Sequence, residues 1–266
     1  IFLNRNLKDA HHNIIKILSS FGPKKNLTHP YVLTNSLIEK LNIEYKEGNF
    51  IERTHVDNFL KNSIDIVNKN LTNIDFPFMQ IYKHNSFNLN CDRHFKVFNK
   101  YSVIPEFCFD CFKIVVEVEN TMDLIKLYFV FDNLYVGLKN IRKVMVDERP
   151  NIAPKYKGFI YSQNLKELDD IASNLQKIIQ KNLGDNFSIT TKRGCTDFSQ
   201  KYPSYKEITK DKNKMMPFVR EWKEKEKIID RKIYNNNSET SYINKYLSGP
   251  KLNDVLIIKN WLEIAK

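Results

Sequence analysis

The sequence predicts an α+β fold: a central ferredoxin-like (βαββαβ) antiparallel sheet with helical N- and C-terminal extensions. Two observations support this prediction. Between residues 113 and 191, short β-branched runs alternate with segments whose apolar residues recur every three or four positions. The order of these six elements is β-α-β-β-α-β, which is typical of the ferredoxin-like arrangement. We therefore divide the chain into a mainly helical region 1–90, a ferredoxin-like domain 91–205 and a helical extension 206–266.

In the N-terminal region the apolar spacing predicts three helices. The first continues through residues 13–18 and stops at Gly22-Pro23, and the second covers 35–41. The third covers 55–71, and its apolar stripe consists of Val56, Phe59, Leu60, Ile64 and Val67. After Asp75-Phe76-Pro77 the chain is expected to be extended or loop-like as far as residue 90.

The central domain is predicted to contain four strands and two helices. The strands are 113–119, 142–148, 157–161 and 187–191. The first helix is capped by Asn120 or Thr121, and the second opens at Asn164 with a capping-box-like pattern and ends at Gly184. Two right-handed crossovers place both helices on one face. We expect the sheet order 4-1-3-2, with the first and third strands central and parallel, and the fourth antiparallel beside the first.

The C-terminal extension is basic and helical. A charged helix is predicted from Met216 to Lys232, and an amphipathic helix from about Asn253. Both are expected to pack against the central domain. The polar stretch Asn235–Thr240 is expected to be a mobile connector.

The composition indicates a folded protein of the reducing cytoplasm. With 42% hydrophobic residues in a chain of 266, a packed core is expected. There is no run of roughly 18 apolar residues, and the start Ile1–Arg5 lacks a signal-peptide pattern. We therefore expect no membrane contact. Four cysteines are too few for a disulfide-stapled secreted scaffold. The first residue is Ile1 rather than Met, as in a fragment or a trimmed chain.

The net charge of +11 has two interpretations. An excess of lysine and arginine favours an anionic partner such as nucleic acid. The same excess arises from an AT-rich coding bias, because Asn, Lys and Ile are all abundant while glycine occurs only 7 times. A solvated basic surface without a partner is the simpler interpretation.

All four cysteines lie in or beside the predicted sheet. Cys108 and Cys111 form a C-x-x-C pair just before the first strand, and Cys195 follows the fourth strand. Because these two strands are antiparallel neighbours, the start of one lies beside the end of the other. Cys91 precedes them on a segment long enough to reach the same point. Gly194 gives the backbone freedom next to Cys195.

Four converging thiolates predict a metal site. They suit either Zn²⁺ or a [4Fe–4S] cluster, and the sequence does not decide between the two. The alternative is four incidental buried thiols, which pack as small apolar groups. A thioredoxin-like redox pair is disfavoured, because Cys108 and Cys111 precede a strand instead of opening a helix. His94 is a substitute ligand at most, and it is expected to be a packing or surface residue.

Charged residues are expected to gather at the same edge of the sheet. Asp147, Glu148 and Arg149 follow the second strand and are the candidate catalytic group, with a carboxylate as general base if burial raises its pKa. Lys192 and Arg193 end the fourth strand and are candidate cofactor-binding residues. Together they would suit an anionic small molecule or a nucleic-acid backbone, or would balance the charge of the thiolates.

One short segment favours a nucleic-acid module as the alternative function. The strand Lys157–Tyr161 resembles the third strand of the RNA-recognition motif, whose aromatic side chains stack on bases. The predicted first strand lacks an aromatic partner. No phosphate-binding glycine loop and no nucleophile elbow are present. The sequence therefore predicts a metal-binding protein, but it does not name a reaction.

Overall fold

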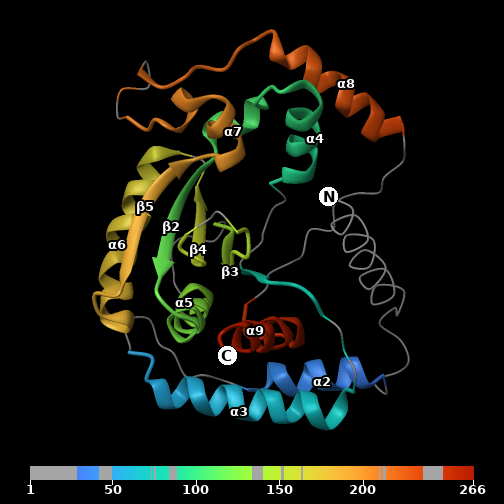
Figure 1. Cartoon of the computed structure of the whole chain (residues 1–266), viewed down its shortest axis with the longest axis vertical. Coiled ribbons are helices and arrows are strands. Elements are labelled where there is room, and N and C mark those ends of the chain that lie inside the picture. Colours follow the sequence, from blue (N-terminus) through green and yellow to red (C-terminus); the bar gives the residue numbers. More distant parts are fainter. Residues whose placement is uncertain are drawn as a thin grey trace.

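The computed structural model describes residues 29–41, 50–72, 74, 76–83, 89–133, 140–150, 153–162, 164–209, 211, 214–235 and 248–266. The helix predicted at 13–18 and nearly all of the predicted connector lie outside these residues. Within them the chain forms an α+β fold with one five-stranded antiparallel sheet at its centre (Figure 1).

The sheet has the order β1-β3-β4-β2-β5. Its strands are β1 (Gln80–Lys83), β2 (Phe112–Val118), β3 (Arg142–Val146), β4 (Tyr156–Ser162) and β5 (Phe187–Arg193). One expectation is wrong. The neighbours β2 and β4 are antiparallel instead of parallel, because the connection between β3 and β4 reverses the chain. The segment expected to be extended or loop-like contains β1, in which buried and exposed residues alternate as in a half-buried strand.

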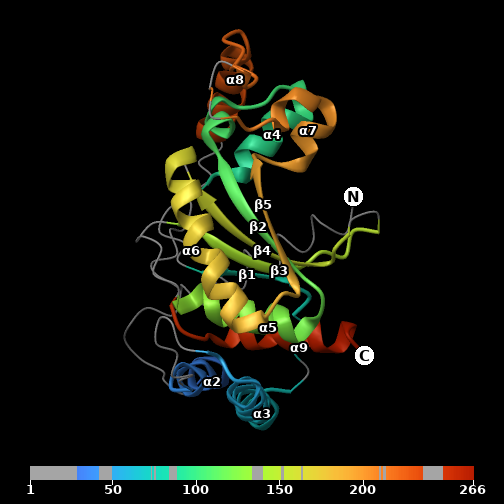
Figure 2. The ribbon, with the colours of Figure 1, turned by 90° about the vertical axis from the view of Figure 1, so that its left-hand side faces the viewer.

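Helices α5 (Thr121–Asn133) and α6 (Leu165–Leu183) cover one face of the sheet (Figure 2). Both N-terminal caps form as predicted. Asn120 accepts a hydrogen bond from the Asp123 N–H at 2.9 Å, and Asn164 accepts one from the Glu167 N–H at 2.8 Å. Gly158 of β4 allows α5 to approach closely, because a Cβ there would lie 2.7 Å from a Leu127 methyl carbon. The opposite face is called the outer face below.

At one end of the sheet the helices α2 (Pro30–Glu39), α3 (Arg53–Asn70) and α9 (Leu252–Ile264) extend the main core (Figure 1). A buried ion pair joins α9 to the sheet. Lys83 of β1 donates to Asp254 at 2.7 Å and to the Gly249 carbonyl at 2.6 Å. The Tyr128 hydroxyl donates to the same carboxylate at 3.0 Å. The buried charges in this contact are therefore compensated.

At the other end a second, aromatic cluster holds the remaining elements. These are α4 (Cys91–Tyr101), the 3-10 helix η1 (Glu106–Asp110), α7 (Thr196–Lys201), the 3-10 helix η2 (Pro203–Lys206) and α8 (Trp222–Asn235). Phe198 and Tyr205 lie at the centre of the cluster with no exposed area. Helix α8 begins at Trp222 and not at the predicted Met216, whose carbonyl instead accepts a hydrogen bond from Arg193 at 3.0 Å.

Replacing Lys83 with Met is expected to lower the free energy of unfolding by about 3–5 kcal/mol, because it leaves buried carboxylates without a cation. Urea unfolding followed by circular dichroism measures this change. The matched control is Lys227→Met, which removes the exposed pair with Glu224 on α8 and is expected to cost under about 1 kcal/mol. Equal losses in the two variants would contradict the role of Lys83.

Candidate functional site

The backbone brings three of the four cysteines together at the end of the sheet where β2 begins and β5 ends. Cys111 directly precedes β2, and its carbonyl accepts a hydrogen bond from the Gly194 N–H at 2.8 Å. Cys195 is the next residue and caps α7. Cys108 lies in η1, and its carbonyl accepts a hydrogen bond from the Cys111 N–H at 3.3 Å. The backbone therefore places Cys195 beside the C-x-x-C turn.

The four thiols have different surroundings but are all desolvated. Cys108 is only 5% exposed within the aromatic cluster, where the Tyr205 hydroxyl donates to its carbonyl at 2.6 Å. Cys91 is an exposed residue at the start of α4, yet burial of its thiol raises the pKa to about 11. Burial also raises the thiol pKa of Cys108 and Cys195, and that of Cys111 to about 12. All four thiols are neutral at pH 7, so none is activated as a nucleophile.

The thiols are mutual neighbours without forming a coordination shell. The charge of each one affects the pKa of the others, and this holds for every pair among Cys91, Cys108, Cys111 and Cys195. Among the described residues, however, no group of three or more His, Cys, Asp or Glu side chains is arranged to hold a metal ion. The four-cysteine metal site therefore stays a prediction.

Two lysine side chains on the outer face reach the same end of the sheet. Lys113 of β2 and Lys143 of β3 place their Nζ atoms 5.5 Å and 4.8 Å from the centre of the Phe159 ring. Lys143 also lies 5.8 Å from the centre of the Tyr82 ring. Burial, together with the charge of Lys113, lowers the pKa of Lys143 to about 8. Lys113 is itself only 8% exposed.

Lys113 is buried and Lys143 is half-buried, and neither has a close anionic partner among the described residues. No hydrogen bond or ion pair joins Lys113 or Lys143 to another residue in the part of the chain that the structure describes. Lys83 and Lys157, by contrast, have a carboxylate oxygen at 2.7 Å and 3.3 Å. Lys113 and Lys143 each act to lower the pKa of the Cys91 and Cys195 thiols, and the charge of Asp147 acts on Lys143 as well.

The candidate catalytic group Asp147, Glu148 and Arg149 leaves the opposite end of the sheet. Tyr156 pairs both with the last residue of β3 and with Val118, the last residue of β2. The expectation that these residues share the thiol edge is wrong, because a right-handed crossover makes β3 run in the same direction as β2. Both strands begin at the thiols and end away from them. The hydrogen bond with Asp147, and also the charge of Asp197 on α7, raise the pKa of Arg149.

The group Asp147, Glu148 and Arg149 also lacks the expected general base, a carboxylate whose pKa is raised by burial. Asp147 is 2% exposed and accepts two hydrogen bonds from the Arg149 guanidinium, both at 2.8 Å. Lys157 lies 3.3 Å from the same carboxylate. These cations hold the pKa of Asp147 at about 2, although burial acts in the opposite direction. Asp147 is therefore an ionised structural partner and a poor general base, while Glu148 is exposed.

Of the two candidate cofactor-binding residues, only Lys192 is free of structural contacts in the described chain. It is exposed and lies opposite Lys113 across the β2–β5 pairing. Arg193 is 6% exposed, and its guanidinium donates to the carbonyls of Phe109 at 2.9 Å and Met216 at 3.0 Å. Arg193 therefore ties η1 and the segment before α8 to the sheet.

His94 lies one turn after Cys91 on α4 but belongs to a different contact. Its ring stacks on Phe107 with the ring centres 5.2 Å apart, and it is 6% exposed. Burial lowers its pKa to about 4, so the ring is neutral at pH 7. The interpretation of His94 as a packing residue fits this position.

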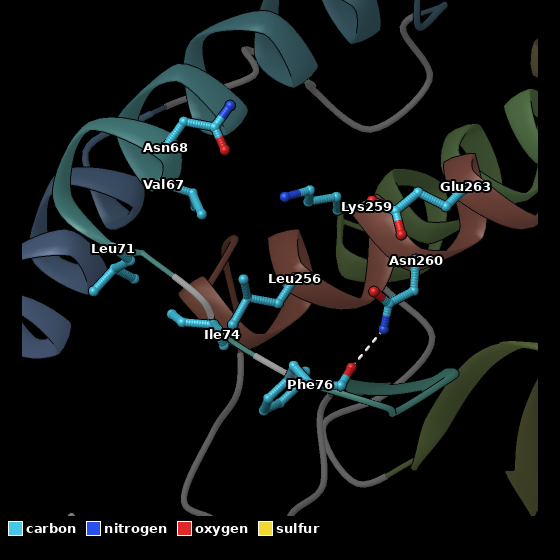
Figure 3. A pocket seen from close by; sticks show the side chains of 9 residues that line it. All are labelled: Val67, Asn68, Leu71, Ile74, Phe76, Leu256, Lys259, Asn260 and Glu263. Carbon is cyan, nitrogen blue, oxygen red and sulfur yellow. Dashed lines mark hydrogen bonds between the residues drawn. The ribbon is translucent and has the colours of Figure 1, made fainter.

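A cavity of about 200 Å³ lies far from the thiols, between α3 and α9 (Figure 3). Its walls include Val67, Leu256 and Asn260, and the Asn260 side-chain amide donates to the Phe76 carbonyl. This volume is below the roughly 300–1,000 Å³ of ordinary ligand sites. The residues that line the cavity include one lysine, Lys259, but no cysteine, so the thiol end is the better candidate site.

Comparison with known proteins finds no relative of this chain: no family model, no curated protein and no solved structure matches it. In the described segments, none of the helices has the length and apolar character needed to cross a bilayer.

Gly194→Ala is expected to destabilise the thiol end of the sheet. Gly194 has φ +54°, and a Cβ there would lie 1.9 Å from the Tyr205 hydroxyl oxygen. Gly184 is a matched control, because it has φ +67° with open space around it. Both variants incur backbone strain of roughly 1–3 kcal/mol, but only Gly194→Ala adds a clash. Urea unfolding should show the larger loss for Gly194→Ala, and equal losses would contradict the close contact.

Proposed function

We propose that this chain binds a thiophilic metal centre, Zn²⁺ or a [4Fe–4S] cluster, through Cys91, Cys108, Cys111 and Cys195. One observation carries the proposal: the Gly194 N–H donates to the Cys111 carbonyl at 2.8 Å, so Cys195 lies beside the turn that holds Cys108 and Cys111. The chain has only 4 cysteines in 266 residues. Packing of thiols as small apolar groups does not account for their meeting at one place.

Closure of the site requires movement of side chains. The η1 turn holds Cys108 and Cys111 next to each other, so this pair supplies one half of the site. Cys91 at the start of α4 and Cys195 at the start of α7 would supply the other half. Rotation about χ1 swings a cysteine Sγ between staggered positions. On binding, the four thiols release their protons to solvent, and the binding free energy adds to the stability of the fold.

The proposed centre would link α4, η1 and α7 to the sheet, which is the role of a structural zinc or a shielded cluster. It requires reduced thiols and therefore a reducing compartment. We further infer that β2 to β5 with α5 and α6 form a ferredoxin-like unit. The strand order β5-β2-β4-β3 and the position of both helices on one face support this inference. The strand β1 is an addition at its edge.

The metal proposal predicts about one centre per chain in protein purified without oxygen. Elemental mass spectrometry identifies the metal, and visible absorption reveals an iron–sulfur cluster. Cys195→Ser is expected to lose as much metal as Cys108→Ser, although 195 and 108 are distant in sequence. His94→Gln is the control and should retain the metal, because the ring stacks on Phe107. Full metal content in Cys195→Ser would refute the four-cysteine site.

A second candidate function is binding of single-stranded nucleic acid by the outer face. It is favoured by the aromatic and cationic side chains gathered there, since Lys143 lies over both Tyr82 and Phe159. Aromatic rings on a sheet can stack on bases while lysines contact phosphates.

For this second candidate, binding of a fluorescent oligouridine should weaken steeply with salt. Tyr82→Ala should weaken it further by roughly 1–3 kcal/mol if the exposed ring stacks on a base. The control is Tyr101→Ala, which removes a ring from α4 at the other side of the aromatic cluster. No binding at low salt, or equal effects of the two variants, would exclude the outer face as a nucleic-acid site.

A further inference from the structure

The two edges of the sheet have different surroundings. The β1 edge is only four residues long and α9 packs against it, where the Trp261 Nε1–H donates to the carbonyl of Met79 at 3.1 Å. The other edge is β5, and no strand of the described chain pairs with its outer side. Figure 2 views the molecule from the side of this edge. Because an unpaired edge strand is a template for pairing with another strand, β5 is a candidate interaction surface.

The alternation of hydrogen bonds identifies the unpaired backbone groups of β5. The Gly194 N–H donates to the Cys111 carbonyl, so every second residue back from Gly194 directs its N–H and C=O groups towards β2. Ile189 and Thr191 are the residues between them, and they direct their N–H and C=O groups away from β2. These groups have no hydrogen-bond partner among the described residues.

The strand β5 lacks the usual features that protect an edge strand from pairing. Its seven residues include no proline, and its register with β2 continues without a bulge. Thr190, Thr191 and Lys192 are all exposed. Thr191 is on the face that carries α6, so its exposure shows that α6 does not extend over this position. A partner strand must, however, accommodate the charge of Lys192.

We propose that the β5 edge pairs with the β5 edge of a second copy of this chain, in an antiparallel two-fold dimer centred on Thr190. In this register Ile189 of each copy exchanges backbone hydrogen bonds with Thr191 of the other, which pairs the outward groups of both residues. The two Thr190 side chains meet on the outer face, where a cross-strand threonine pair is favourable. The two sheets then form one continuous sheet.

Charge complementarity favours a second copy as the partner. In the dimer, Lys192 of one copy lies opposite Ser188 of the other, whose hydroxyl donates to Glu117 of the neighbouring β2 at 3.1 Å. The Cα atoms of Lys192 and this Glu117 are two strand spacings apart, roughly 10 Å. The two long side chains can meet over the small serine. Within its own chain Lys192 lies opposite another cation, Lys113.

The two-fold axis forms the contact between Lys192 and Glu117 twice. Any other two-fold axis along β5 moves Lys192 away from Ser188, so the charges also select the register. An unrelated extended peptide would satisfy the backbone of β5 but would not by itself supply the two carboxylates.

The test measures the mass of the full chain by sedimentation velocity over a range of concentrations, under reducing conditions that prevent cross-linking through the thiols. The wild type is expected to show a monomer–dimer equilibrium. Lys192→Glu and Glu117→Lys each bring like charges together twice, and each is expected to weaken dimerisation roughly tenfold or more. Lys61→Glu makes the same change at an exposed position of α3 and is the matched control, with wild-type dimerisation.

A mixture of the two interface variants separates the proposed contact from a general loss of folding. Each variant repels its own kind, but a Lys192→Glu chain and a Glu117→Lys chain together restore both opposite-charge contacts. The mixture is therefore expected to form a heterodimer with roughly wild-type affinity. In the wild type, amide hydrogen exchange at Ile189 and Thr191 should slow as the concentration rises.

Three outcomes would overturn the inference. The first is a wild-type chain that stays monomeric at every concentration, including the case in which its β5 edge instead binds an unrelated peptide. The second is a dimer that neither interface variant weakens. The third is a mixture of the two variants that remains monomeric while the wild type dimerises.

Discussion

The pairing of β2 with β5 is the constraint on which the site depends. Its register places Phe112 opposite Arg193, and the bond from Gly194 to Cys111 continues the same ladder beyond the strands. A slip of one residue would turn every side chain of β2 to the other face. Lys113 would then point at α5 and α6, and Ile114 at the outer face. The helix-facing apolar residues therefore fix the position of the thiols and lysines at the same time.

The buried and half-buried lysines of the described chain have two kinds of surroundings. At the α9 end and in the β3–β4 connection, each buried lysine has a carboxylate at hydrogen-bond or ion-pair distance. At the thiol end, Lys113 and Lys143 lie near the Phe159 ring, and among the described residues neither forms an ion pair. Buried charged groups without a partner of opposite charge are expected at sites where a bound ligand supplies that charge. This contrast between paired and unpaired lysines distinguishes the thiol end from the rest of the described chain.

The regular elements of the central domain could be predicted from the sequence because each has a strong local pattern. The strands β2 and β5 and the capped helix at Asn164 follow from β-branched runs and from cap chemistry. The strand β1 was missed because four residues with only Ile81 and Lys83 buried carry little signal. Helix α4 was missed because its buried residues include His94, and a left-handed Asn90 precedes it without a side-chain cap.

The site was only partly predictable, and the direction of the strands explains both the success and the failure. The antiparallel pairing of β2 with β5 correctly brings Cys111 near Cys195. The chain then crosses over from β2 to β3, so that these two strands run in the same direction. The start of β3 therefore lies near the thiols, and Asp147, which follows β3, lies at the far end of the sheet. A lysine inside a strand is ordinarily a solvated residue, so sequence alone does not single out Lys143. Its significance depends on the tertiary structure: three strands present Lys113, Lys143 and Phe159 on one face, near the end of the sheet where the C-x-x-C turn and Cys195 meet.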